Sequence, residues 1–183
     1  MKTTLNLLLV LVLSNRLEAQ NQKIMKSTND SITKGQVITK GKLVYSEILI
    51  HASPERVWKE FTAFETYPSW NPFIKSLKGK VVVGAKIEVV LTPPGKKGMT
   101  FKPEVLAFDS LSQLRWIGKL IVKGIFDGEH VFLIKDNKDG TTTFMQFERF
   151  KGILIPFMKK MLDGNTLNGF RQMNEALKFR CEK

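Results

Sequence analysis

The chain has 183 residues, 43% of them hydrophobic and 10% aromatic, which suits one globular domain with a sizeable core. Its single cysteine, Cys181, excludes an intramolecular disulfide and a cysteine-rich metal site. The net charge of +12 at pH 7 would attract nucleic acid or an anionic membrane, but the lysines are dispersed and no arginine-rich helix accompanies them. We therefore expect a solvated basic surface and no binding of nucleic acid.

The first 19 residues have the pattern of an export signal. Lys2 precedes an apolar run, Leu5–Leu13, and the residues after it lead to a cleavage site behind Ala19. About nine apolar residues are too few to span a bilayer core of roughly 30 Å. We therefore expect residues 1–19 to be a cleaved signal peptide and the protein to be secreted or periplasmic. The alternatives are a membrane anchor that is not cleaved and a cytoplasmic protein.

A polar linker and then a folded domain follow. Residues 20–42 contain few apolar anchors, so we expect the domain to cover residues 43–183. Alternation predicts a strand at Leu43–Ile50, and Ser53 and Pro54 then start a helix. Further strands are predicted at residues 77–83, 86–91, 99–108, 114–122 and 126–134, and an Asp-Gly turn predicts a hairpin to a last strand at 141–151.

The C-terminal residues Pro156–Lys183 predict one long amphipathic helix. Its interior glycines, Gly164 and Gly169, each cost about 1 kcal/mol relative to alanine. They permit close packing against the sheet or leave room for a bound molecule, and the sequence favours neither. The element order predicts an α+β domain in which a curved, seven-stranded antiparallel sheet wraps around this helix. The gap between sheet and helix becomes a cavity if large side chains do not fill it.

Several segments carry a family resemblance. "ASPERVWKEFTAFETYPSWNPFI", "PPGKKGMTFKPEVL", "LRWIGKL", "FDGEH" and "MNEAL" resemble the START-like, helix-grip superfamily called SRPBCC, and its polyketide cyclase/dehydrase-like branch most of all. The resemblance covers about residues 44–182 and implies the helix-grip fold with short helices after the first strand. It does not decide the function, because the superfamily includes lipid carriers, hormone receptors and aromatase/cyclases.

The resemblance implies that "YPSWNPF", Tyr67–Phe73, lies at the mouth of the cavity. Trp70 and Phe73 would then form part of its wall, although Trp70 can equally belong to the core. Asn71 would bond a polar group of a ligand or cap the turn. The remaining candidate wall residues come from the strands and the C-terminal helix and are mostly apolar or small: Phe101, Trp116, Gly118, Phe132, Met158, Met161, Gly164, Phe170 and Met173.

Three polar residues are expected to point inward. Alternation directs His130 inward on one strand and Gln146 and Glu148 on the next, and the hairpin places His130 opposite Glu148. The pair is a candidate general acid and base, because a carboxylate raises the pKa of a neighbouring imidazole toward neutrality. It is equally a candidate for fixing strand register or orienting a ligand. No nucleophile motif, phosphate loop or metal cluster accompanies it, so we expect no cofactor and no metal.

The leading hypothesis is therefore a binding or carrier domain for a small hydrophobic or amphipathic molecule. One alternative is a cofactor-free cyclase or dehydratase that uses His130 and Glu148. Another is a module that docks on anionic lipid or on a partner. We expect a monomer or weak dimer, with peripheral membrane contact as a further possibility.

Overall fold

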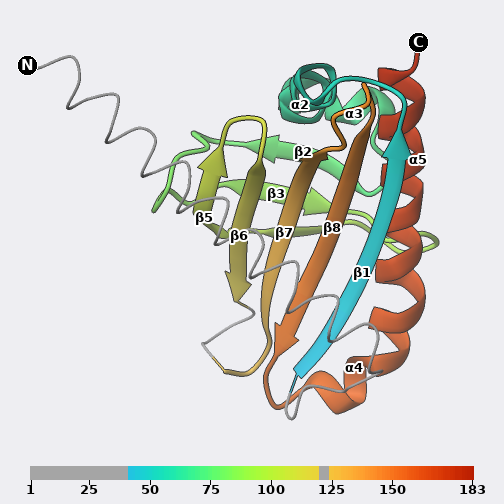
Figure 1. Ribbon diagram of the computed structural model, residues 1–183. Coiled ribbons are helices and arrows are strands. Elements are labelled where there is room, and N and C mark those ends of the chain that lie inside the picture. The colour runs from blue at the N-terminus through green and yellow to red at the C-terminus, as the bar shows by residue number, and fades with distance from the viewer. Residues whose placement is uncertain (1–40, 120–123) are drawn as a thin grey trace, which may run out of the picture. The chain divides into compact units, whose positions relative to one another are not determined.

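The computed structural model describes residues 41–119 and 124–183, without the side chains of residues 41, 42, 159–161 and 163 (Figure 1). The predicted signal peptide and nearly all of the predicted linker therefore lie outside the described residues. Among the helices within the described ranges, none is long and apolar enough to cross a membrane.

A five-stranded antiparallel sheet forms the main layer, with the strand order β1-β8-β7-β6-β5. The strands are β1 (Gly41–Ile50), β5 (Glu104–Asp109), β6 (Gln113–Lys119), β7 (Asp127–Asp136) and β8 (Thr142–Lys151). The predicted hairpin joins β7 to β8, and its register pairs His130 with Glu148, which confirms the prediction from alternation. Phe144 and Phe150 alternate onto the same face of β8 as Gln146 and Glu148, which were predicted to point inward, and both belong to the core.

The opposite face of β8 is less exposed than the alternation suggests. Met145 and Phe147 point away from the core, yet both are buried. Phe147 stacks on Tyr45 of β1, with 6.4 Å between the ring centroids, and the guanidinium of Arg149 lies 4.7 Å from its ring centre. A strand with two covered faces shows a weaker period of two than a strand with one face in water.

A second sheet has three strands in the order β2-β3-β4, namely β2 (Ile74–Lys78), β3 (Glu88–Leu91) and β4 (Met99–Phe101). The predicted strand at 77–83 is wrong beyond Lys78, because Gly79 adopts a φ of 107° that ends the strand. The predicted strand at 99–108 is in fact two strands in different sheets, β4 and β5. Pro103 lies at the break, and proline cannot donate a backbone hydrogen bond to a sheet. The described residues thus form eight strands in two sheets rather than seven in one.

Short helices follow β1, as expected: α2 (Pro54–Thr62), a 3-10 turn at Phe64–Thr66 and α3 (Tyr67–Trp70). Ser53 caps α2 and accepts a hydrogen bond from the amide of Arg56. The C-terminal helix lies where it was predicted but is not continuous. It consists of α4 (Ile155–Met161), a π-helical stretch η2 (Leu162–Thr166) and α5 (Leu167–Cys181).

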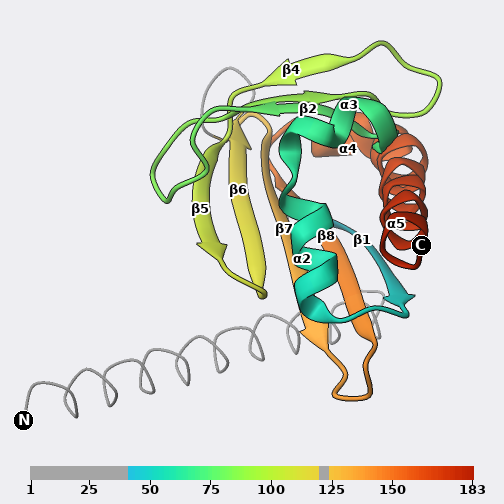
Figure 2. The ribbon, with the colours of Figure 1, turned by 90° about the horizontal axis from the view of Figure 1, so that it is seen from above.

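The five-stranded sheet, the three-stranded sheet and α5 surround a common interior, which Figure 2 shows from above. The buried face of α5 supplies Phe170, Met173 and Leu177 to this core, as expected for the predicted amphipathic helix. The two glycines have different roles. A Cβ on Gly169 would overlap the ring of Phe73, whereas a Cβ on Gly164 would meet nothing within 4 Å. Close packing therefore explains Gly169.

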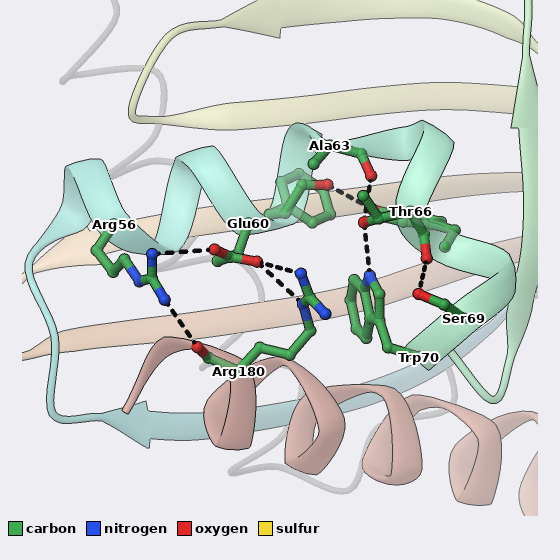
Figure 3. Close-up of polar contacts among 9 residues, drawn as sticks. Arg56, Glu60, Ala63, Thr66, Ser69, Trp70 and Arg180 are labelled. Atoms are coloured by element: carbon green, nitrogen blue, oxygen red, sulfur yellow. Dashed lines mark hydrogen bonds and ion pairs between the residues drawn. The ribbon is translucent and has the colours of Figure 1, made fainter. Parts of the chain in front are cut away.

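A polar cluster joins α2 and α3 to α5 (Figure 3). Glu60 of α2 accepts two hydrogen bonds from the guanidinium of Arg180, at 2.7 and 2.9 Å, and forms an ion pair with Arg56 at 3.1 Å. Arg56 in turn donates to the backbone carbonyl of Arg180. Because Glu60 is 9% exposed and both partners are arginines, this cluster holds the helix pair in one arrangement.

Candidate functional site

A mostly apolar cavity lies between the two sheets and the η2 stretch. The accessible volume of this cavity is about 80 Å³, which is several times what one water molecule requires. It therefore accommodates a small ring or a short chain. Its polar side chains are those of Glu148, Thr166 and Lys119. The lining residues come from both sheets, the loops beside them and η2: Phe73, Val89, Leu91, Pro93, Met99, Phe101, Pro103, Trp116, Gly118, Lys119, Phe126, Gly128, Glu148, Phe150, Leu162 and Thr166.

Two glycines make room in the wall. Gly118 of β6 pairs with Gly128 of β7. A Cβ on Gly128 would overlap the carboxyl group of Glu148, so the missing side chain provides the space in which that carboxyl lies. A Cβ on Gly118 would meet only the backbone oxygen of Gly128, at 3.9 Å, and would otherwise project into open space. A ligand can therefore approach the backbone of β6 closely at this position.

The Glu148 carboxyl is the acidic group in the described wall of the cavity. Its side chain is 13% exposed, and burial raises its pKa from 4.5 to about 8. Water is a much better solvent for a carboxylate than this apolar wall, so the neutral acid is favoured. At pH 7 Glu148 is therefore mostly protonated and presents a hydroxyl donor and a carbonyl acceptor to the cavity.

His130 lies behind Glu148 and is completely buried. Its imidazole stacks against the rings of Phe132 and Phe170, with centroids 4.2 and 4.8 Å away. Burial lowers the pKa of His130 to about 3, against a weaker opposing effect of its hydrogen bond with Gln146. The predicted rise of the His130 pKa toward neutrality is therefore wrong, because a neutral acid in an apolar wall does not stabilise an imidazolium.

The polar chain behind His130 determines which ring nitrogen carries the proton. The amide nitrogen of Gln146 donates to the carbonyl of Phe170 at 3.0 Å and to Asn174 at 2.5 Å. Asn174 donates onward to Ser46 of β1 at 3.0 Å. The oxygen of Gln146 therefore faces His130, at 3.3 Å from Nε2, so Nε2 is the protonated nitrogen.

The other nitrogen of His130, Nδ1, is then an acceptor, and it has no hydrogen-bond partner among the described residues. It lies 3.7 Å from Oε2 of Glu148, beyond hydrogen-bond distance. A small shift of the carboxyl group would let the protonated Glu148 donate to Nδ1. Because Glu148 carries a single hydroxyl hydrogen, it can donate either to Nδ1 of His130 or to a molecule in the cavity, but not to both at once.

Five of the predicted site residues line the cavity, namely Phe73, Phe101, Trp116, Gly118 and Glu148. Among the described residues, the other predicted positions lie behind the wall or away from it: Trp70, Asn71, His130, Phe132, Gln146, Met158, Gly164, Phe170 and Met173. The side chain of Met161, also predicted to line the cavity, lies outside the described ones. Whether the lining residues bind a ligand stays a prediction.

The residues of the stretch Tyr67–Phe73 have different environments. Asn71 is buried, and its side-chain oxygen accepts hydrogen bonds from the amides of Phe73 and Ile74, so it caps the turn. The indole of Trp70 donates to Thr66 and lies beside Arg180, in the polar cluster of Figure 3. Only Phe73 of this stretch reaches the cavity.

Several wall residues escaped the sequence analysis. Val89 and Leu91 share one face of β3, so their spacing of two was a usable signal. Thr166 had a signal too, because it lies at helical spacing from Leu162 and Phe170 on the predicted apolar stripe of the terminal helix. Lys119 had none, because a single polar residue at a strand end does not indicate which surface it faces. Among the described residues, no three His, Cys, Asp or Glu side chains gather in a way that could hold a metal ion.

Comparison with known proteins identifies related sequences and folds. The sequence profile of the family described as polyketide cyclase/dehydrase and lipid transport matches residues 43–182. Among curated protein sequences, none matches this chain.

Solved structures with the same fold include two enzymes. The aromatase/cyclase Zhui from Streptomyces sp. R1128 is 11% identical with a TM-score of 0.63, covering 78% of this chain and 94% of that chain. Norcoclaurine synthase from Thalictrum flavum, in complex with dopamine and hydroxybenzaldehyde, is 13% identical with a TM-score of 0.58, covering 79% and 91%. A protein from Thermus thermophilus is 19% identical with a TM-score of 0.58, covering 76% and 97%. These likenesses show a common fold and confirm the predicted helix-grip architecture.

Proposed function

The chain belongs to the polyketide cyclase/dehydrase and lipid transport family, and on this premise we propose that it binds and carries a small, uncharged, mostly apolar molecule in the cavity beside Glu148. The observation that carries the proposal is a neutral carboxyl group in a mostly apolar wall, whose other polar side chains are those of Thr166 and Lys119. Apolar walls with a few placed polar groups are typical of small-molecule sites.

The chemistry of the wall narrows the ligand class. A protonated Glu148 can donate one hydrogen bond, so a carbonyl, ether or hydroxyl oxygen on the ligand suits it. An anionic ligand end beside Glu148 is disfavoured, because it would be desolvated in the same apolar wall. The backbone of Gly118, which no side chain covers, and the indole of Trp116 in the cavity wall favour a flat ring system beside them.

Native mass spectrometry of the protein purified from its own host tests the proposal. We expect an additional mass of one small molecule, which is released unchanged on denaturation. Gly118→Leu should remove it, because a Cβ at this position makes only one contact, at 3.9 Å, and the rest of the leucine side chain would occupy the cavity. Gly164→Leu is the matched control, since Gly164 is outside the lining. An adduct of equal amount in the Gly118→Leu protein, or no adduct in the wild type, would contradict the proposal.

A second candidate function is acid catalysis by Glu148, and its raised pKa is the observation that favours it. A pKa of about 8 places proton donation near neutral pH, where general acids work best. His130 would then be a positioning residue, because its neutral Nδ1 faces the carboxyl. Glu148→Gln separates the two candidates. A carrier should retain its ligand, whereas an enzyme should lose about 10²–10⁴ in rate with substrate affinity nearly intact.

We also propose that the protein acts outside the cytoplasm, after cleavage near Ala19. The apolar run Leu5–Leu13 with Lys2 before it supports this location. An intact mass measured on protein from its own host should lack the first 19 or so residues. A mass that includes Met1 would contradict the proposed cleavage and export.

A further inference from the structure

Two large apolar side chains project into solvent where β8 leads into α4. Phe157 is 85% exposed and Ile153 is 72% exposed. Ile153 lies in the turn just before α4 and Phe157 lies in the first turn of α4, so the two side chains stand four residues apart where the strand leads into the helix. Single exposed apolar residues are ordinary, but two of this size and exposure together indicate a contact surface.

The backbone holds this pair in a defined position. Gly152 adopts a φ of 134°, and the amides of Ile153 and Leu154 donate to the carbonyls of Gly124 and Ile125 at 3.3 and 3.2 Å. A Cβ on Gly152 would overlap the carbonyl of Ile125. The exposed side chains are therefore carried by a segment bonded to the turn before β7, not by a free loop.

Basic residues lie near the pair in the chain and at the same end of the sheet. Lys119 and Lys151 are exposed and lie in one cross-strand row at this end of the sheet, with Asp127 between them. In the sequence, residues 151–161 contain three lysines and no acidic residue. An apolar centre with a basic border is the composition of surfaces that lie in the headgroup region of anionic membranes.

This surface adjoins the cavity. Lys119 lines the cavity and is exposed, and Phe126 and Leu162 line it from the elements next to Ile153 and Phe157. Figure 1 shows α4 at the lower end of β8, which is also the end where β6 finishes. A molecule leaving a lipid layer here would have a short path to the cavity wall.

We propose that the α4 face, defined as Ile153, Phe157, Lys119 and Lys151, docks on the surface of an anionic lipid membrane. Phe157 and Ile153 enter the headgroup region, and the lysines bind the lipid phosphates. The inference goes beyond the proposed function, because docking does not require that the cavity be occupied.

A position-specific fluorescent label tests the docking on the full-length chain. Phe157→Cys is labelled with nitrobenzoxadiazole, whose emission moves to the blue in an apolar environment. Cys181 is buried, and its thiol pKa is raised to about 12, so the dye reacts with the introduced thiol. The matched control is Phe179→Cys on α5, because Phe179 is 63% exposed and outside the α4 face.

We expect the dye at position 157 to shift to the blue on vesicles of phosphatidylcholine mixed with phosphatidylglycerol, and the dye at 179 to stay unchanged. Pure phosphatidylcholine vesicles should give a much smaller shift, and about 0.5 M salt should weaken the effect. The unlabelled double variant Ile153→Ser, Phe157→Ser should lose about tenfold in vesicle affinity relative to Phe179→Ser.

Three results would overturn the proposal. One is protein that floats with the vesicles while the dye at 157 keeps its aqueous spectrum, which would assign membrane binding to another part of the chain. Another is an equal shift at position 179. The third is a shift that needs no vesicles and grows with protein concentration, which would make the α4 face an interface between two copies of the chain.

Discussion

Replacing Glu148 by glutamine should change how the stability of the protein depends on pH. Glutamine has the shape of the protonated acid and is neutral at every pH. In the wild type, the pKa of Glu148 is about 8 in the folded state and 4.5 in an unperturbed glutamate. The folded protein therefore binds more protons than the unfolded chain between these values, and its free energy of unfolding falls as the pH rises through this interval.

The effect of Glu148 on stability is best measured between pH 6.5 and 8. Above pH 6.5 the imidazole of His130 is mostly neutral in both states, since its folded pKa is lowered to about 3. Across this window Glu148 should remove about 1.5 kcal/mol of unfolding free energy from the wild type. The Glu148→Gln protein should lack this loss and become the more stable of the two toward pH 8.

Urea unfolding, followed by tryptophan fluorescence at a series of pH values, measures the difference directly. Glu175→Gln, at an exposed position of α5, is the control and should keep the wild-type slope. Parallel curves for the wild type and Glu148→Gln would show that Glu148 is ionised in the folded protein. The argument for a neutral acid in the cavity wall would then fail.

Two further substitutions test the packing of α5. On an exposed helix, Gly→Ala raises the free energy of unfolding by about 1 kcal/mol. At Gly169 the new methyl group would overlap the ring of Phe73, so we expect Gly169→Ala to lower the free energy of unfolding by about 1–3 kcal/mol. Gly164→Ala, where the added carbon meets nothing, should not show this loss, and equal stability of the two variants would contradict the packing argument. Glu60→Ala should cost about 1–3 kcal/mol because it leaves Arg180 and Arg56 without their shared carboxylate. The control Glu65→Ala is exposed and should change stability by less than about 0.5 kcal/mol in the same urea assay.

The pairing of His130 with Glu148 was predictable because it depends on local chemistry. An Asp-Gly turn sets the register of a hairpin, and a period of two then assigns each later residue to a face. The break at Pro103 was also open to prediction, since a proline inside a run of strand residues argues against one continuous strand.

The electrostatics of the pair could not be predicted in this way. The ring nitrogen of His130 that carries the proton depends on Gln146, whose orientation is set by Asn174 of α5, 28 residues further along the chain. The pKa of Glu148 depends on how much of the wall is apolar, which results from the packing of two sheets and η2. Local pattern places residues on faces, whereas a pKa follows from everything that surrounds the group.

Trp70 shows the same limit for an apolar residue. Its neighbours in sequence, Asn71 and Phe73, are buried, and nothing in the pattern separates it from them. Its position follows from the contact between α3 and α5, where the indole meets Arg180.

The π-helical stretch η2 sets the rotation of one end of the terminal helix relative to the other. A π-helical turn contains about one residue more than an α-helical turn. Each residue of an α-helix advances the chain by about 100° around the helix axis. Removing one residue from Leu162–Thr166 would therefore give a regular helix and turn α4 by about that angle against α5. The side of α4 that now carries Phe157 would face elsewhere, while Phe170 and Met173 stayed in the core. The five-residue length of η2 thus determines the direction in which the exposed ring of Phe157 points while the core residues of α5 stay in place.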